Sequence, residues 1–226
     1  MQVTEIYRSI QGESSYAGLP CIFVRLTGCN LRCSWCDSEY TFMGGRKMSA
    51  DEVMSAVSAC GPARLVEITG GEPMLQDREL LPLMDRLLDA GYTVLLETSG
   101  ERPLSNVPKP VIKIVDVKCP GSGEGDSFNM ANLEALGSAD EVKFVLADRT
   151  DYEFAREFTR AHRLSQRVHS VIFSPAFAKD ATGPRDSSHC LLDPRELTEW
   201  ILQDGLQVRL GLQIHKFIWD PAMKGV

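Results

Sequence analysis

The sequence predicts an α/β protein, a partial and open TIM-like barrel of parallel strands with helices outside. Apolar, β-rich runs alternate along the chain with amphipathic helical patterns, which is typical of parallel strands covered by helices. The chain has 226 residues, whereas a closed eight-fold barrel typically needs about 250. Pro103, Pro108 and Pro110 stand between the third and fourth expected strands, where a closed barrel would need a helix.

The expected strands are runs of apolar and β-branched residues bounded by turn signals. They are Ile22–Leu26, Leu65–Thr69, Thr93–Glu97, Ile112–Val117, Glu141–Leu146, Val168–Phe173 and Gln207–Ile214. A polar segment before the first of them predicts an N-terminal hairpin. We therefore expect a single domain over residues 1–226, with a hairpin at 1–20, a barrel core at 21–216 and a C-terminal tail at 217–226.

Helix positions follow from capping signals, in which a side chain accepts from a first-turn N–H and an acidic residue follows three positions later. The expected pairs are Ser49 with Glu52, Thr150 with Glu153, and Asp193 with Glu196. A further helix is expected from about Glu79 to Gly91, with leucines along one face. The loops Gly121–Gly125 and Lys179–His189 are expected to be mobile lids.

Composition excludes several classes of protein. Hydrophobic residues make up 43% and charged residues 24% of the chain, which is ordinary for a globular domain. The formal charge of −7 without a basic run argues against nucleic-acid binding. No apolar stretch is long enough to span a bilayer and no secretory signal is visible, so we expect a cytoplasmic protein with no membrane partner.

The seven cysteines fit a reducing compartment, where disulfides are rare. Cys21, Cys60, Cys119 and Cys190 are far apart in sequence and are expected to be small buried hydrophobes. The others, Cys29, Cys33 and Cys36, form a C-x3-C-x2-C motif after the first expected barrel strand.

The spacing of these three cysteines indicates an iron–sulfur cluster with an open corner. Four-iron clusters normally take four thiolates, so three leave one iron free to bind a small molecule, and this favours an enzyme. The alternative is structural zinc, which usually needs four protein ligands in two separated pairs. Only one C-x2-C pair is present, Cys33 with Cys36.

Two motifs give the chain a resemblance to a known superfamily. The cysteine motif, with Trp35 before its last cysteine, and Gly70-Gly71-Glu72-Pro73 after the second expected strand resemble the radical S-adenosylmethionine superfamily. The resemblance implies a [4Fe–4S] cluster on Cys29, Cys33 and Cys36, with S-adenosylmethionine bound at the open iron. An electron from the cluster then cleaves the sulfonium to give a deoxyadenosyl radical.

The resemblance also implies which residues contact S-adenosylmethionine. They border the adenine, follow the glycine-rich turn, or stand at the ends of later strands, where a barrel binds its ligand. They are Trp35, Cys36, Asp37, Gly70, Gly71, Glu72, Ser99, Asp116, Val117, Lys118, Ser174, Pro175, Ala176 and Phe177.

Three further segments narrow the resemblance to one family. Ser9–Glu13, Phe23–Leu26 and Leu212–Phe217 resemble the 7-carboxy-7-deazaguanine synthases. This family implies a carbon–nitrogen lyase that converts 6-carboxy-5,6,7,8-tetrahydropterin to 7-carboxy-7-deazaguanine with loss of ammonia, in 7-deazapurine (queuosine) biosynthesis. The implied substrate contacts are Ile10, Gln11, Gly12, Glu13, Arg25, Thr69, Glu97 and His215.

The family also implies a magnesium ion and two kinds of partner. Family members hold Mg²⁺ on a threonine two residues after the last cysteine, where this chain has Ser38, also a hard oxygen ligand. The implied partners are an external electron donor of the flavodoxin or ferredoxin type and a second copy in a homodimer. Glu13, Glu97 and His215 are the candidates for acid–base chemistry.

Two other functions remain open at this point. A glycyl-radical activating enzyme shares the cysteine motif and the glycine-rich turn but acts on a protein backbone. A non-enzymatic metal or electron-transfer protein would leave that turn and the polar strand ends unexplained. The segment Ile10–Glu13 and Arg25 favour a small anionic heterocycle instead.

Overall fold

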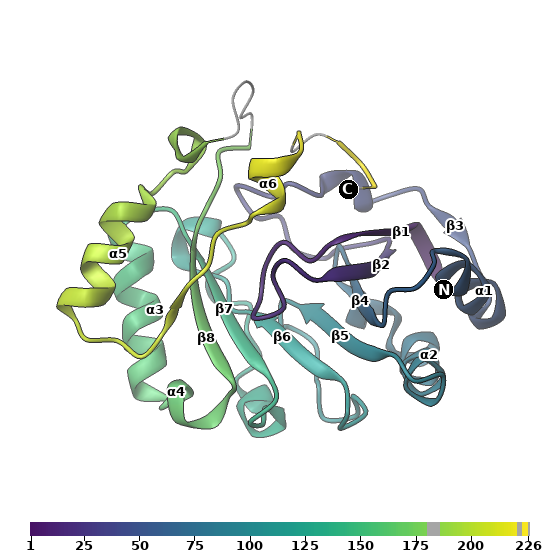
Figure 1. The fold of residues 1–226 in the computed structure, drawn as a ribbon. Helices are drawn as coiled ribbons and strands as arrows, with labels where there is room; N and C mark the ends of the chain where they lie inside the picture. Colours follow the sequence, from purple (N-terminus) through teal and green to yellow (C-terminus); the bar gives the residue numbers. More distant parts are fainter. Residues whose placement is uncertain (180–185, 221–222, 226) are drawn as a thin grey trace.

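The fold is one curved, mostly parallel sheet with helices outside it (Figure 1). The computed structural model describes residues 1–179, 186–220 and 223–225. In this part of the chain the sheet has nine strands, in the order β3-β1-β2-β4-β5-β6-β7-β8-β9. All pairs from β2 to β9 are parallel. The predicted α/β class with an open parallel barrel is confirmed.

The strand bounds agree with most of the predicted runs. The strands are β1 Gln2–Ile10, β2 Pro20–Leu26, β3 Arg46–Lys47, β4 Leu65–Gly70, β5 Thr93–Thr98, β6 Ile112–Asp116, β7 Glu141–Leu146, β8 Ser170–Pro175 and β9 Arg209–Leu210. Two predictions were wrong in extent. Val168 ends a helix instead of starting β8, and the last strand stops before Gly211, which packs against Ile172 in β8.

The helices flank the sheet on its convex side, apart from α6, which lies above the strand ends near the β1–β2 hairpin (Figure 1). They are α1 Ala50–Ala59, α2 Asp77–Asp89, α3 Arg149–Ala161, α4 Leu164–Arg167, α5 Pro194–Gln203 and α6 His215–Ile218. The short 3₁₀ turns are η1 Glu39–Thr41, η2 Pro73–Gln76, η3 Pro120–Ser122, η4 Met130–Ala135 and η5 Ser187–His189.

The capping predictions are confirmed in two of three cases. Ser49 and Glu52 form the full capping box of α1, and Asp193 caps α5. Helix α3 is capped by Asp148 and not by Thr150, because the Asp148 carboxylate accepts from the backbone N–H of Asp151. A carboxylate at this position also suits the positive end of the helix dipole.

Two separate apolar cores result from the curvature of the sheet. The larger one lies between the sheet and the helices, and the smaller one fills the inside of the barrel with residues such as Cys21, Phe23 and Leu95. Every residue of β4 is buried, as expected for a central parallel strand covered on both faces. None of the helices in the described residues is long and apolar enough to cross a membrane.

The loop between β1 and β2 closes the amino-terminal end of the barrel. Strand β1 pairs antiparallel with β2, from Val3 opposite Leu26 to Ile10 opposite Pro20. The backbone N–H of Ser15 in this loop donates to the carboxylate of Glu141 at 3.0 Å, and its hydroxyl donates to the same group. Glu141 is fully buried at the first position of β7. The carboxyl ends of the strands are therefore the open side.

We predict that Glu141→Gln weakens this closure and lowers the free energy of unfolding by about 1–3 kcal/mol, the usual cost of an impaired buried hydrogen bond. Urea unfolding measures the change. The control is Glu134→Gln, because that side chain is 86% exposed and should change stability by less than about 0.5 kcal/mol. Equal unfolding midpoints for the wild type and Glu141→Gln would contradict the prediction.

Candidate active site

A cavity of about 230 Å³ opens at the carboxyl ends of the strands. Arg25, Thr69, Glu97 and Asp116 line it from four neighbouring strands. This is the end at which parallel barrels place their ligands. A pocket of this kind, with polar groups converging on one volume, is the usual form of a small-molecule site.

Most residues predicted from the sequence line this one cavity. On the predicted substrate side they are Ile10, Gln11, Gly12, Glu13, Arg25, Thr69, Glu97 and His215. On the predicted cofactor side they are Cys29, Cys33, Trp35, Cys36, Asp37, Ser38, Gly70, Gly71, Ser99, Asp116, Lys118 and Phe177. The structure thus brings the two predicted sets face to face.

Five predicted residues do not line the cavity. Val117 belongs to the core between the sheet and the helices, and Ser174, Pro175 and Ala176 are buried within or directly after β8. Glu72 is 1% exposed and accepts hydrogen bonds from within the protein. These five residues lie behind the wall of the cavity, and their contact with S-adenosylmethionine stays a prediction.

Glu72 joins the ends of β4 and β5. One carboxylate oxygen accepts from Thr98 Oγ1 at 2.8 Å and from the backbone N–H of Met74 at 2.9 Å. The other accepts from Ser99 N and Ser99 Oγ, at 2.9 and 2.7 Å. Glu72 therefore positions the glycine-rich turn against Ser99, and its contact with S-adenosylmethionine stays a prediction.

The cysteine loop packs backbone to backbone against the same turn. The N–H of Glu72 donates to the carbonyl of Gly28 at 2.7 Å. A Cβ on Gly71 would overlap that carbonyl and contact Cys29. Only glycine allows this approach, which explains why the two motifs occur together.

A second segment supports the cysteine loop from below. The N–H of Ser34 donates to the carbonyl of Ser122 at 2.9 Å, and that of Arg32 donates to Glu124 Oε1 at 2.6 Å. The carboxylate of Asp151 in α3 accepts from the N–H of Gly121 at 2.7 Å. The expectation that Gly121–Gly125 is a lid was wrong. Of the other expected lid, residues 180–185 lie outside the described residues.

The three thiols of the cysteine motif line the cavity. Burial raises the pKa of Cys33 to about 11 against the opposing effect of Lys118, and burial also raises the pKa of Cys29. Metal binding would therefore release protons. Among the described residues, no three His, Cys, Asp or Glu side chains converge on one ion position. In an iron–sulfur cluster each thiolate binds a different iron, so such convergence is not needed.

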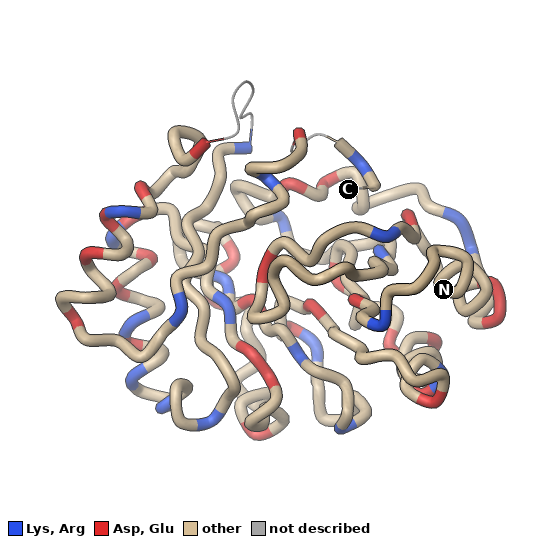
Figure 2. Tube along the Cα trace, viewed as in Figure 1, with Lys and Arg blue, Asp and Glu red and all other residues tan. Residues whose placement is uncertain are grey.

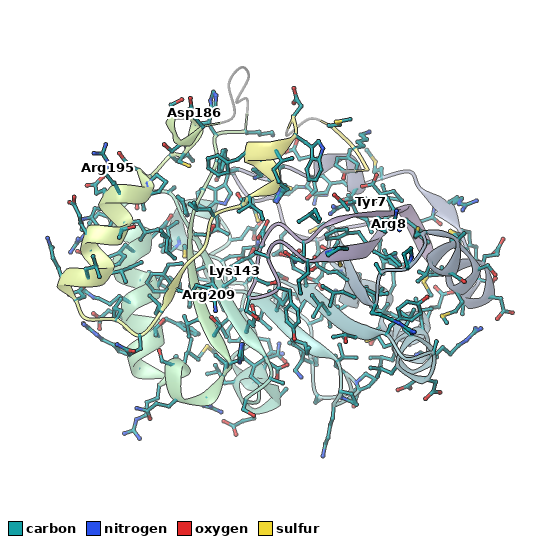
Figure 3. The ribbon with its side chains drawn as sticks, viewed as in Figure 1. Tyr7, Arg8, Lys143, Asp186, Arg195 and Arg209 are labelled. Carbon is teal, nitrogen blue, oxygen red and sulfur yellow. The ribbon has the colours of Figure 1, made fainter. Side chains whose placement is uncertain are left out.

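The substrate side is organised by Lys143, which the sequence analysis missed. Its Nζ lies 2.5 Å from Glu13 Oε2, 2.5 Å from Glu97 Oε1 and 3.7 Å from Asp116 Oδ2. Figure 3 shows Lys143 at the middle of the molecule, between β7 and the β1–β2 hairpin. A lysine in an apolar strand, two residues after Glu141, is the signal that could have revealed it.

Lys143 sets the protonation of its partners. Burial by itself would raise the pKa of Glu13, but Lys143 and His215 outweigh it and hold the pKa at about 2. Burial by itself would lower the pKa of Lys143. Glu13, Glu97 and Asp116 outweigh burial and raise the pKa of Lys143 well above its usual range. Thr69 Oγ1 donates to Glu97 Oε2 at 3.0 Å. The pocket therefore gathers the carboxyl groups of Glu13, Glu97 and Asp116 around one buried ammonium.

Helix α6 connects the cysteine loop to the hairpin. Asp37 Oδ2 lies 2.6 Å from Lys216 Nζ, which also donates to Gln213 Oε1 at 2.9 Å. Gln213 Nε2 in turn donates to Glu13 Oε1 at 2.7 Å. Burial opposes ionisation of Asp37, but the Lys216 ammonium more than offsets it and lowers the pKa of Asp37.

The hairpin and α6 meet at a glycine. The N–H of Ile214 donates to the carbonyl of Gly12 at 2.9 Å. A Cβ on Gly12 would overlap the imidazole of His215. Burial lowers the pKa of His215, so the ring favours its neutral form and can accept or donate a hydrogen bond.

Arg25 is oriented by residues that the sequence analysis did not select. Its Nε donates to Glu5 Oε1 at 2.9 Å and its Nη2 donates to Tyr7 Oη at 2.7 Å. Tyr40, four residues after Cys36, donates to the same oxygen of Glu5 at 2.8 Å. The planar guanidinium is thus fixed at the rim of the pocket, in a form suited to a carboxylate.

Ser38 lies beside the last cysteine. Its Oγ is 4.0 Å from Cys36 Sγ, and its carbonyl accepts from Thr41 Oγ1 at 2.7 Å. Ser38 lines the cavity, so its hydroxyl can reach a ligand or an ion there.

Comparison with known proteins agrees with this geometry. Residues 23–117 match the model of the Radical SAM superfamily. The chain is 70% identical to a 7-carboxy-7-deazaguanine synthase of Koribacter versatilis over the full length of both. It is 42% identical to the enzyme of the same name from Chlorobaculum tepidum, covering 97% of that protein. A crystal structure of QueE from Escherichia coli matches with a TM-score of 0.73 at 25% identity, over 93% of this chain and 92% of that one.

We predict that Gly12→Ala displaces α6, because the added methyl group would overlap His215. Amide hydrogen exchange should become faster over residues 214–218 and stay unchanged in β4 and β5. The matched control is Gly137→Ala, whose Cβ would meet Asp140 at an ordinary 3.9 Å. Unchanged protection of residues 214–218 in Gly12→Ala would show that the close approach is not required.

We predict that Lys143→Met lowers the free energy of unfolding by about 3–5 kcal/mol, because it leaves buried carboxylates without a counter-charge. Adding Glu97→Gln should restore part of the loss, since it removes one of those charges. The control is Lys113→Met, which breaks the buried pair with Asp140 at 3.0 Å and should gain nothing from Glu97→Gln. Strictly additive effects of Lys143→Met and Glu97→Gln in urea unfolding would contradict the coupling.

Proposed function

The chain belongs to the 7-carboxy-7-deazaguanine synthase family of the radical S-adenosylmethionine superfamily, and from this we propose that it converts 6-carboxy-5,6,7,8-tetrahydropterin to 7-carboxy-7-deazaguanine with release of ammonia. The observation that carries the proposal is one cavity lined both by Cys29, Cys33 and Cys36 and by Arg25, Glu13 and His215. Substrate and products differ only by the ammonia lost, so the conversion consumes no net oxidant.

Membership of the superfamily implies a [4Fe–4S] cluster and S-adenosylmethionine. The three cysteines would hold the cluster. The backbone of Gly70 and Gly71, together with Ser99, would line the binding site of S-adenosylmethionine. When bound, this pair supplies the radical that starts the ring contraction. The protein contributes orientation within one pocket.

We assign the substrate-binding roles from the charges of the pocket. Arg25 binds the substrate carboxylate, since Glu5 and Tyr7 already fix the plane of its guanidinium. Glu13 and Glu97 accept from the N–H groups of the pterin ring, because Lys143 holds both carboxyl groups at the wall of the cavity. His215, whose pKa is lowered by burial, is placed to move a proton in its neutral form.

The pocket favours this substrate class over the two alternatives. A cavity of about 230 Å³ suits a small heterocycle, whereas an activating enzyme must admit a protein backbone. A protein that only carries electrons has no use for the buried ion pairs opposite the cysteines. Both features support the synthase.

We further propose Mg²⁺ at Ser38, an external electron donor of the flavodoxin or ferredoxin type, and a homodimer. Ser38 Oγ offers one hard oxygen ligand on the cavity wall. Beyond Val3 the outer edge of β1 has no strand partner in the described residues, which leaves an edge available to a second copy. Location in the cytoplasm is supported by seven free cysteines, because a reducing compartment keeps thiols available as ligands.

The experiment that tests the function is anaerobic turnover of the reconstituted protein with dithionite, S-adenosylmethionine, Mg²⁺ and the carboxytetrahydropterin. We expect ammonia and 7-carboxy-7-deazaguanine in equal amounts, and neither from Cys33→Ala. The control is Cys21→Ala, a fully buried cysteine outside the cavity lining, which should keep product formation. An intact cluster with no deazapurine formed would overturn the proposed function.

The magnesium proposal has its own prediction. Ser38→Ala should require a higher Mg²⁺ concentration for half-maximal turnover, because one oxygen ligand is lost, whereas Ser38→Thr should match the wild type. Cluster content by iron and sulfide analysis should be equal in all three proteins. If Ser38→Ala and the wild type respond to Mg²⁺ identically, the ion is not held at Ser38.

A further inference from the structure

Glu67 is a buried carboxyl group that neither the sequence motifs nor the roles assigned above explain. It stands in the middle of β4, is 2% exposed and lines the cavity. In the described residues Gln11 is its single side-chain hydrogen-bond partner, with Gln11 Nε2 donating to Glu67 Oε2 at 2.5 Å. Buried carboxyl groups usually have more hydrogen-bond partners than this, so the position of Glu67 needs an explanation.

Gln11 transmits this contact to the hairpin loop. Its Oε1 accepts from the backbone N–H of Glu13. Its own backbone N–H donates to Leu19 O at 2.9 Å, and its carbonyl accepts from Gly18 N at 2.8 Å. The side-chain amide is thus held at both ends and is 3% exposed. Gln11 therefore has a role inside the protein beside its predicted contact with the substrate.

The position of Glu13 depends on this arrangement. The Glu13 carboxylate must meet Lys143 Nζ on one side and Gln213 Nε2 on the other, at 2.5 and 2.7 Å. The backbone N–H of Glu13 is held by the side chain of Gln11. The side chain of Gln11 is held in turn by Glu67 on the central strand β4. Sites held on strands are more precise than sites held on loops alone.

The charges around Glu67 indicate that it carries a proton. The groups that face it are the carboxylates Glu13 and Glu97, the ammonium of Lys143, and the thiol of Cys21. Lys143 is bonded to the two carboxylates and not to Glu67. Burial, with the repulsion of Glu97, raises the pKa of Glu67 well above its usual range.

We propose that Glu67 is a positioning residue for pterin binding, which fixes the Gln11–Glu13 loop against β4 and so places the Glu13 carboxylate between Lys143 and Gln213. This role rests on the proposed function, because it concerns how that substrate is held. A neutral acid suits the task, since it accepts from Gln11 without adding a further negative charge to a pocket that must admit an anionic substrate.

The test compares variants of the full-length holoenzyme. Glu67→Ala should raise KM for the carboxytetrahydropterin by roughly tenfold, as expected for a lost buried hydrogen bond, and leave the affinity for S-adenosylmethionine unchanged. Glu67→Gln keeps a neutral acceptor and should rescue KM. The control is Cys21→Ala, in the same inner core, which should leave KM unchanged. An unchanged KM in Glu67→Ala, or an equal rise in Cys21→Ala, would overturn the proposal.

A double-mutant cycle separates this role from a general loss of stability. Gln11→Ala should reproduce the rise in KM, and adding Glu67→Ala to it should cause little further change, because both act through one contact. Additive effects would overturn the proposal. Glu67→Leu, of similar volume, replaces Glu67→Ala in the cycle if the alanine variant does not fold.

A spectroscopic measurement reports on the proton independently of turnover. The infrared difference spectrum between the wild type and Glu67→Gln at neutral pH should contain the carbonyl band of a protonated carboxylic acid. A carboxylate band in its place would overturn the neutral form. Lack of product in the wild type would instead count against the proposed function, whereas normal wild-type turnover with an unaffected Glu67→Ala counts against this inference alone.

Discussion

The buried ammonium of Lys143 is the interaction on which the pocket depends. Without it, Glu13, Glu97 and Asp116 would bring uncompensated negative charges into the barrel, which costs several kcal/mol for each ion. With it, the two nearest carboxyl groups both lie 2.5 Å from the same nitrogen. Glu13 comes from the hairpin loop and Glu97 from β5, so one cation fixes the hairpin to the barrel. Figure 2 shows charges of both signs spread along the rest of the chain. The charged groups that gather in one place are those around Lys143, inside the protein.

Close backbone approach is the second constraint, and glycine meets it on both sides of the cavity. Gly71 lets the turn after β4 reach the cysteine loop, and Gly12 lets the hairpin reach His215. The ion pair of Asp37 with Lys216 then joins the cysteine loop to α6. The two halves of the site are therefore joined by one continuous chain of contacts, from Asp37 through Lys216 and Gln213 to Glu13. Such continuity suits a reaction in which a radical must form close to the atom it attacks.

Local signals in the sequence were enough to predict the parallel α/β class and the cysteine loop. Most of the residues that line the cavity were implied by the resemblance to the family, whose motifs lie mainly at strand ends. Lys143 had only one signal, its place in an apolar strand. Glu67 could not be predicted from such a signal, since the role of an inward-facing charge in a strand is recognisable only once the register shows which residues oppose it. Glu72 shows a related limit of the sequence. Its motif identifies the turn, but only the packing shows that the carboxylate points back to Thr98 and Ser99.

Glu13 and Glu67 show how one lysine produces two different carboxyl groups within the same barrel. Glu13 lies against Lys143 and has a pKa of about 2, whereas burial and the nearby Glu97 raise the pKa of Glu67. Enzymes commonly separate acid and base roles by placing two such groups in contrasting surroundings. In this pocket the contrast also limits total charge: an anionic substrate can enter a cavity rich in carboxyl groups only if part of them is neutral or paired. Glu67 satisfies the first condition and Glu13 the second, so the same arrangement orders the loop and admits the substrate.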